Sequence, residues 1–524
     1  MPLASSVSIG GAIVSSCHIH SLDDDCLIAI FYDVIRCPPR RWRAIVLDLA
    51  ELWAQVVFAY PKAFHTLLGR ARECPLKGAA KTQSGQLSDE QVAYMLSHPE
   101  RLRVLALPSE IRPSIALAFA GLSLPVLQKL VIDFSSHWDD TFGEGEPYND
   151  FHYDERALDA PLLRTVTFGN IFIPLVAPRL TSLTLLKDNG SPGGVDPTDI
   201  CTLLRSAPML KDIVLESCFS GGDWEMEEGV APIELPNLLR LLISGHIADI
   251  IGVFAAIGHM NESVCVYLTI SDIDEDEEES IAELSHALGP CLRPGLHDTL
   301  SVSGFDTGAT QGEPFLKLTS SERDVGPLFS PYTLAIEVKE SLIDVMMRLY
   351  LGIFKQLPEG QIRHLSVCHQ DRYNAFTWVE TLPVFHLPAL SQSVETLFYE
   401  IEMERLGPMT DVADFGSGLL PKFLLVDPFV YPKLTSITIN GDLGGDHYAT
   451  ATTPEDINEL ITWLKARAAC DRPRIVFRLT GDSYKIPFSG ESGVVMRPRD
   501  WKILEKLDEW VEIVDERTLV APKE

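Results

Sequence analysis

The chain has 524 residues, of which 74 are acidic and 43 are basic, so its formal net charge is −31. A chain this acidic is a poor candidate for nucleic-acid binding, because neutralising phosphates requires clustered lysine and arginine. Apolar residues make up 46% of the sequence, which is enough for a large core, and the length suggests several domains or one long repeat array.

Other features narrow the class of protein further. The longest apolar stretch, near Ile115–Leu127, is too short to span a membrane, so we expect no membrane partner. The ten cysteines form no CxxC pair, which indicates neither a disulfide framework nor a zinc cluster. We therefore expect a protein of a reducing compartment, either the cytoplasm or the nucleus.

The first predicted element is a short amphipathic helix after Ser21, preceded by a flexible tail over residues 1–18. The Ser21 side chain can cap the helix, and the aspartates that follow it suit the positive end of the helix dipole. The next apolar pattern begins at Trp42 and continues through Leu52 and Trp53. We predict a small helical module over residues 19–60, which Trp42 and Trp53 hold together.

The order of these motifs resembles the F-box of fungal F-box proteins that have a leucine-rich-repeat-like C-terminal region. The resemblance is carried by Leu22–Phe31, Arg40–Ile45, Leu52-Trp53, Phe64–Ala71 and His98–Leu105. It implies a substrate-recognition subunit of a Skp–cullin–F-box ubiquitin ligase, with no catalytic residue and no cofactor of its own. The residues that would face the Skp-family adaptor, and through it a cullin–RING ligase, are Leu22, Leu27, Ile30 and Phe31.

The spacing inside this module leaves a second interpretation open. Only Tyr32–Pro39 separates the first helix from Arg40, where the family normally has a further helix. Cys37-Pro38-Pro39 forbids a continuous helix through this gap. The alternative is a non-catalytic leucine-rich-repeat interaction scaffold that does not bind the ligase adaptor.

A helical connector is expected over residues 61–100, and after it one pattern recurs: Pro-x-Leu-x-x-apolar-x-apolar. Proline favours an extended segment, and apolar residues two apart point to one face of a strand. The six full copies begin at Pro125, Pro161, Pro178, Pro208, Pro236 and Pro432. Copies without the proline are Leu102/Leu105/Leu107, Ile362/Leu365/Val367 and Val394/Leu397/Tyr399.

Helical stretches precede several copies, as at Pro197–Ser206 before Pro208, so each unit is predicted to run helix, turn, strand. Such a unit buries its apolar face only by stacking on its neighbours. We therefore predict an α/β chain in which the F-box-like module precedes an irregular leucine-rich-repeat-like solenoid over 101–480. Short parallel strands would line the concave face and helices the convex face. No clear copy occurs between residues 244 and 361, and the alternative is a set of unrelated amphipathic strands in an α/β domain.

Polar strand positions would point to the concave face and bind a client protein. These candidates are Lys129, Thr167, Thr184, Glu216, Ser244 and Thr438, and a register slip of one residue would reverse their direction. The run Asp272–Glu279 is interpreted as a solvated acidic loop. Together with the net charge, it suggests a basic client.

Catalytic and metal-binding patterns are missing. The sequence has no phosphate-binding loop, zinc-protease motif or serine-hydrolase motif, and Asp414-Phe415-Gly416 is interpreted as a turn. The pairs His18/His20 and His364/His369 lack metal-ligand spacing. An enzyme with an unrecognised site is the least favoured alternative.

The last predicted element caps the array. Segment 481–524 contains an amphipathic pattern from Pro498 to about Val514, with Ile503, Leu507 and Trp510 at helical spacing. A solenoid needs its last apolar edge covered, so we expect this helix to cover it.

Overall fold

The computed structural model describes part of the chain. The described residues are 47–79, 87–107, 111–134, 151–188, 192–221, 224, 231–261, 264–271, 278–293, 295–304, 315–319, 334–339, 343–370, 388–402, 430–440, 454–480, 482–484, 507–516 and 518–520. Several predictions lie outside these residues. They are the tail 1–18, the helix with Leu22, Leu27, Ile30 and Phe31, and also Trp42, His18, His20 and Asp414-Phe415-Gly416.

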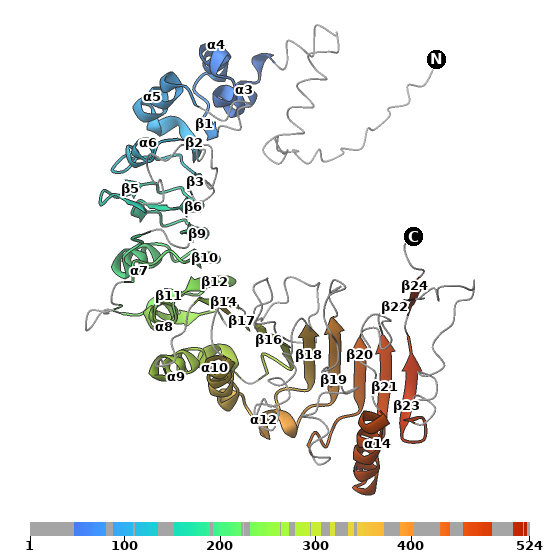
Figure 1. Cartoon of the computed structure of the whole chain (residues 1–524). Coiled ribbons are helices and arrows are strands. Elements are labelled where there is room, and N and C mark those ends of the chain that lie inside the picture. Colours follow the sequence, from blue (N-terminus) through green and yellow to red (C-terminus); the bar gives the residue numbers. More distant parts are fainter. Residues whose placement is uncertain are drawn as a thin grey trace, which may run out of the picture.

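The described residues form a mixed α/β structure dominated by one large, mostly parallel sheet (Figure 1). Its 16 described strands lie in the order β1-β2-β3-β6-β9-β10-β12-β14-β17-β16-β15-β18-β19-β20-β21-β23. In chain order they are β1 (Leu76–Ala79), β2 (Leu102–Leu107), β3 (Lys129–Asp133), β6 (Thr165–Gly169), β9 (Ser182–Leu186), β10 (Asp212–Glu216), β12 (Arg240–Gly245), β14 (Cys265–Ser271), β15 (Thr299–Gly304), β16 (Phe315–Thr319), β17 (Leu334–Lys339), β18 (His364–Gln370), β19 (Thr396–Glu402), β20 (Ser436–Asn440), β21 (Ile475–Thr480) and β23 (Val511–Asp515).

Helices and short strand pairs connect these strands. The α-helices are α3 (Ala50–Val56), α4 (Phe64–Ala71), α5 (Asp89–Ser97), α6 (Pro113–Leu117), α7 (Pro197–Ser206), α8 (Ile247–Ala256), α9 (Glu278–Ala287), α10 (Ile343–Gln356), α12 (Pro388–Ser391) and α14 (Pro454–Ala469). The 3-10 helices are η2 (Val57–Ala59), η3 (Pro61–Ala63), η4 (Pro99–Arg101) and η5 (Gly289–Leu292). The two-stranded pairs are β4 (His152–Tyr153) with β7 (Ile171–Phe172), β5 (Leu158–Asp159) with β8 (Leu175–Val176), β11 (Ile233–Leu235) with β13 (Ile257–Met260), and β22 (Asp482–Tyr484) with β24 (Thr518–Val520).

Each full copy of the proline pattern leads into a strand of the large sheet, which confirms the strand predictions. The strand begins four residues after the proline, as in β3 after Pro125 and β20 after Pro432. The leucine of the pattern has an exposed fraction of 0% in all six copies: Leu127, Leu163, Leu180, Leu210, Leu238 and Leu434. The three copies without proline lead into β2, β18 and β19.

The large sheet is bent into an arc, with its strands on the inner side and helices α5 to α10 on the outer side (Figure 1). Burial alternates along the strands, as the period of two requires. In β9, Leu183 and Leu185 are buried in the same core as Leu204 of α7, whereas Thr184 is half-buried on the opposite face. We call that opposite side the inner face.

The sheet extends beyond the predicted 101–480 at its N-terminal end. Region 61–100, expected to be a helical connector, contains α4 and α5 but also β1, which pairs in parallel with β2. The sequence Leu76-Lys77-Gly78-Ala79 is too short and too weakly apolar to signal a strand by itself. Pairing with β2 stabilises it, because it completes the hydrogen-bond ladder at this edge.

The predicted helix over Pro498–Val514 is wrong at its C-terminal end. Leu507 is helical and residues 498–506 lie outside the described part, but residues 508–510 form a turn and Val511–Asp515 form β23, which pairs in parallel with β21. Val511, Ile513 and Val514 are β-branched residues, which favour extended backbone when a neighbouring strand is present. The apolar spacing from Leu507 to Val514 fits both the helical period of 3.6 residues and the strand period of two, because the stretch is short.

The region without clear copies holds a change of strand direction. β16 lies between β15 and β17 and is antiparallel to both. The order in space is therefore β14, β17, β16, β15, β18. The acidic run also differs from the predicted loop, because Glu278 and Glu279 form the first turn of α9, where carboxylates suit the helix dipole. Its residues 272–277 lie outside the described part.

Candidate functional site: the inner face of the sheet

All six candidate client-binding residues lie on the inner face. Lys129 and Glu216 are exposed, and the four hydroxyl residues are half-buried. The strand register brings Thr167 opposite Thr184, and Glu216 opposite Ser244. Lys129 lies opposite Thr165, and Thr438 lies far along the arc in β20. The predicted face is therefore one surface, but only two pairs of its candidates are neighbours.

The strand register arranges the inner-face side chains in rows that cross the sheet. The middle row contains, in spatial order, Ala106, Val131, Thr167, Thr184, Val214, Leu242, Tyr267, Ala335, Lys317, Ser301, Ser366, Phe398, Thr438, Arg478 and Val514. Sequence reasoning missed Leu242, Tyr267 and Phe398, because only polar positions were considered. A large apolar residue between two core positions of a strand was the available signal.

Charges of both signs occur on the inner face. Among the strand positions whose side chains the structure describes, the acidic residues of this face are Asp133, Asp212, Glu216, Glu337 and Glu512, and the basic residues are Lys77, Lys129, Arg240, Lys317 and Arg478. Two of these bases have acidic partners. Arg240 Nε lies 3.2 Å from Asp212 Oδ1, and Arg478 Nη1 lies 3.1 Å from Glu516 Oε1. The acidic excess of the chain is therefore not concentrated on these strands.

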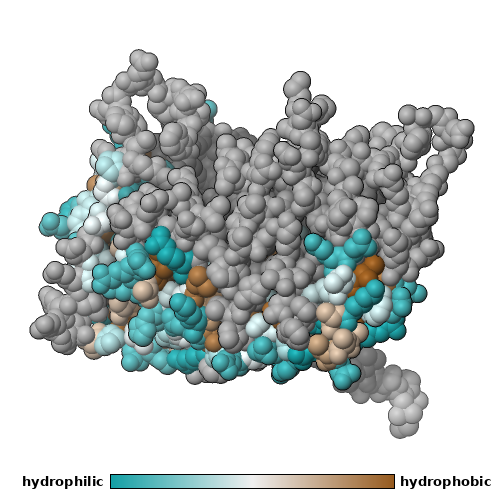
Figure 2. All heavy atoms as spheres, turned by 60° about the horizontal axis from the view of Figure 1, so that its bottom comes forward, coloured by the Kyte–Doolittle hydropathy of each residue, from teal (hydrophilic) through white to brown (hydrophobic). Residues whose placement is uncertain are grey.

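The outer side of the arc differs from the inner face. Figure 2 brings the bottom of Figure 1 forward, and the described residues there are mainly hydrophilic, with small, separate hydrophobic spots. Within the described part of the chain, no helix has both the length and the apolar character that crossing a bilayer requires.

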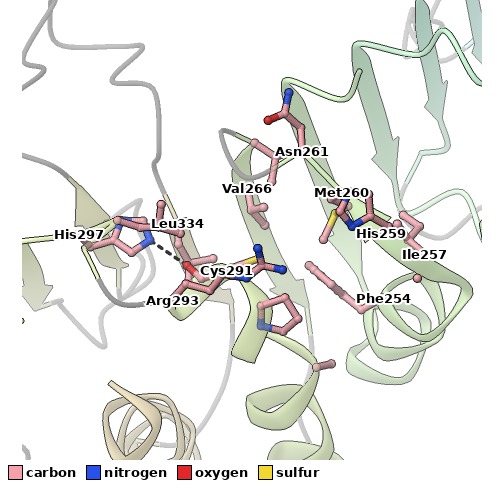
Figure 3. Close-up of a pocket in the computed structure, with 15 residues that line it drawn as sticks. Phe254, Ile257, His259, Met260, Asn261, Val266, Cys291, Arg293, His297 and Leu334 are labelled. Carbon is pink, nitrogen blue, oxygen red and sulfur yellow. Dashed lines mark hydrogen bonds between the residues drawn. The ribbon is translucent and has the colours of Figure 1, made fainter. Parts of the chain in front are cut away.

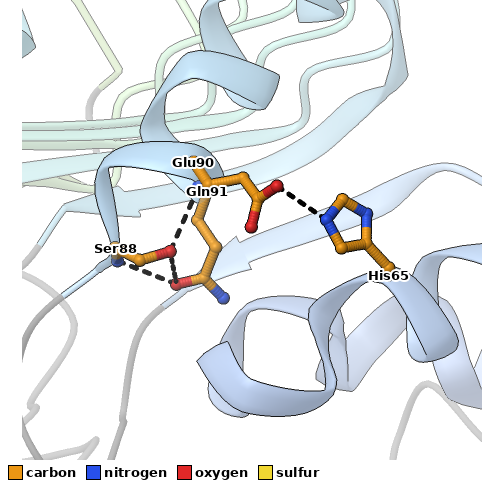
Figure 4. A network of polar contacts seen from close by, with 4 residues as sticks. All are labelled: His65, Ser88, Glu90 and Gln91. Carbon is orange, nitrogen blue, oxygen red and sulfur yellow. Dashed lines mark hydrogen bonds and ion pairs between the residues drawn. The ribbon is translucent and has the colours of Figure 1, made fainter.

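A polar network near the start of the sheet has a structural role (Figure 4). The Ser88 N–H donates to Gln91 Oε1 (3.0 Å) and the Gln91 N–H donates to Ser88 Oγ (3.3 Å), which forms a capping box at α5. Gln91 Nε2 donates to the Phe58 carbonyl, and His65 Nε2 lies 2.6 Å from Glu90 Oε1. These contacts fix α5 against α4 and η2.

Of the two tryptophans predicted to hold the module 19–60 together, Trp42 lies outside the described residues. Trp53 packs beyond that module, against α4. Its side chain is buried, and its indole N–H donates to the Leu47 carbonyl at 3.2 Å. The Arg70 guanidinium lies over the ring, 4.7 Å from its centroid. Trp53 therefore connects α3 to α4.

A small pocket lies between α8, β13 and η5 (Figure 3). Its volume is about 100 Å³, which is small for a site that encloses a metabolite. Burial raises the pKa of Cys291 to about 12, so this thiol is protonated at neutral pH and is not a nucleophile. His297 Nε2 lies 2.9 Å from the Cys291 carbonyl oxygen, which ties the ring to the wall. The pocket lies where β17 follows β14, so we interpret it as a packing gap.

Trp224 fixes the segment after β10 to α8. Its indole N–H donates to Asp249 Oδ1 at 3.1 Å, and its ring packs against Phe219 with centroids 5.3 Å apart. Burial raises the pKa of Asp249, while the Trp224 hydrogen bond and the nearby His246 and Lys187 oppose this shift. Among the described residues, no three His, Cys, Asp or Glu side chains lie close enough to hold a metal ion.

Comparison with known proteins adds no family. No protein-family model matches the chain, and no curated protein matches it.

Proposed function

We propose that this protein is the substrate-recognition subunit of a Skp–cullin–F-box ubiquitin ligase. Its F-box-like N-terminal segment would bind the Skp-family adaptor, and a leucine-rich-repeat-like solenoid would bind the client. The observation that carries the client-binding part is the inner face itself. It presents side chains in register across the large sheet; most of those described are half-buried, whereas Ala335 of β17 is buried and Lys129, Glu216 and Arg478 are exposed.

The recurrence of one unit supports the solenoid part of the proposal. The series β9, α7, β10 and the series β12, α8, β14 both run from an inner strand through an outer helix to the next parallel strand. Each strand stacks on its neighbour with the same register. A surface built in this way is long, continuous and suited to a protein partner.

The adaptor-binding part rests on the N-terminal motifs alone. Co-purification of the full chain with a Skp-family adaptor tests it, beside the double variant Leu27→Asp/Phe31→Asp. A matched control is Met209→Asp/Leu239→Asp, because these side chains are 47% and 48% exposed and lie in the large-sheet region. We expect a stoichiometric complex that only the Leu27/Phe31 variant abolishes, because an adaptor interface depends on apolar anchors.

The second candidate function is a scaffold that does not bind the adaptor, which the short Tyr32–Pro39 spacing favours. A folded chain that forms no adaptor complex would contradict the ligase role and leave the inner face as the functional part.

A further inference from the structure

We propose that the client element bound by the inner face is a basic, amphipathic segment, and that it binds across β10, β12, β14 and β17. This inference rests on the proposed client-binding function. It specifies which part of the inner face binds and what chemistry the client must present.

The apolar part of this surface is a run of three neighbours in the middle row. Val214, Leu242 and Tyr267 lie opposite one another in β10, β12 and β14. Adjacent strands are about 4.8 Å apart, so the three side chains cover roughly 10 Å. Each is half-buried, and Tyr267 supplies the kind of aromatic anchor that carries binding energy in protein interfaces.

One flank of this run is acidic. The next row, toward the carboxyl ends of the strands, contains Glu216, Ser244, Thr269 and Glu337 in register. The two carboxylates therefore stand about 14 Å apart at the ends of the row. Thr269 Oγ1 donates to Glu337 Oε2 at 3.0 Å, which holds that carboxylate on the face. In the described residues of this row from β3 to β17, none is basic.

The ammonium group of Lys187 is bound to a backbone carbonyl. Lys187 follows β9, and its ammonium donates to the Gly193 carbonyl at 2.6 Å. Asp249 also lies near this ammonium, and the Lys187 backbone N–H donates to the Glu216 carbonyl at 2.9 Å. The opposite flank is electrically balanced, because Arg240 and Asp212 form an ion pair there.

The charges of Glu216 and Glu337 favour a client segment that carries basic side chains. A neutral apolar segment would desolvate Glu216 and Glu337 without compensation, and an acidic one would be repelled. A segment with apolar side chains toward Tyr267 and lysine or arginine toward Glu216 and Glu337 satisfies both parts of the surface.

Synthetic peptides test this inference on the purified full chain without adaptor. The probe is a 12-residue alternating Leu-Lys peptide, with Leu-Glu and Ser-Lys peptides of the same length as controls. The test variant is Glu216→Gln/Glu337→Gln. The matched control is Glu283→Gln/Glu459→Gln, because these exposed residues lie on helices α9 and α14, outside the acidic run and the inner-face strands, and the net charge changes equally.

We expect the Leu-Lys peptide to bind about fivefold more weakly to the inner-face variant and with unchanged affinity to the control variant on α9 and α14. We also expect Tyr267→Ala to weaken the binding of the Leu-Lys peptide. The Ser-Lys peptide, which has no apolar side chain, should bind poorly to the wild type and to every variant. Equal weakening by both glutamate pairs would overturn the inference, because the peptide would then sense only the net charge. Adaptor binding is measured separately by co-purification. Failure of that experiment would contradict the ligase role and would not affect the peptide-binding result.

Discussion

Arg467 shows how a single residue holds a turn of this fold. Its side chain is 2% exposed, and its guanidinium donates to the carbonyls of Tyr431 (3.0 Å) and Leu434 (3.1 Å). It also lies over the Trp463 ring, 5.0 Å from the centroid. Burial lowers the pKa of Arg467 to about 10, so the group remains charged at neutral pH. Arg467 therefore connects α14 to the proline turn that leads into β20.

Replacing Arg467 by alanine should lower the free energy of unfolding by about 2–4 kcal/mol, because two buried carbonyls lose their donor. Arg205→Ala, an exposed position on α7, serves as the control and should change it by less than about 0.5 kcal/mol. Urea unfolding of both variants measures the difference. Equal effects would show that the buried hydrogen bonds of Arg467 contribute nothing.

The direction of inner-face side chains could be predicted from sequence, because the period of two is local. Thr167, Thr184 and Ser244 all lie on the predicted face. The Arg467 contacts could not be predicted, because they join residues more than 30 positions apart whose proximity depends on the fold. Tyr267 was missed because only polar strand positions were considered, although tyrosine occurs at interfaces as well as in cores.

At the scale of elements, the contact between α8 and Trp224 depends on Gly252, which has no side chain. A Cβ on Gly252 would lie 2.1 Å from Cγ and Cδ2 of the Trp224 ring, so only glycine leaves room for this ring. Gly69 in α4 has no heavy atom within 4 Å of the same position. A glycine-to-alanine substitution therefore meets open space at Gly69 and a steric clash at Gly252.

Gly69→Ala should stabilise the protein by up to about 1 kcal/mol, because alanine favours helix more than glycine does. Gly252→Ala should destabilise it, because the indole must leave its place and the bond to Asp249. In a Trp224→Ala background, Gly252→Ala should no longer destabilise. Thermal unfolding of the four variants completes this double-mutant cycle. A stabilising Gly252→Ala in the wild-type background would refute the proposed packing.

The sequence predicted elements well where apolar spacing was strong. The helix before Pro208 was expected over Pro197–Ser206, and these are the bounds of α7. Asp196 accepts a hydrogen bond from the Thr198 N–H, which fixes the start. β1 and β23 were missed because edge strands are short and depend on their single neighbour.

At the scale of the whole molecule, β16 divides a regular parallel array into two. Residues 299–339 supply β15, β16 and β17 in an order reversed in space, so the helix–turn–strand period is lost there. This change accounts for the missing proline pattern over residues 299–339, whereas β14 (Cys265–Ser271) continues the parallel array without the pattern. The strands on both sides of this change remain in one sheet, so the inner face is continuous across it.

The most direct test of the inner face as the binding surface compares two threonines of one unit. Thr184 lies on the inner face of β9, and Thr202 is exposed on the outer helix α7. A photoreactive amino acid would replace each in turn in the full chain, and client adducts would be detected after irradiation in a cell lysate. We expect adducts from position 184 and none from position 202. Adducts from position 202 alone would contradict binding at the inner face.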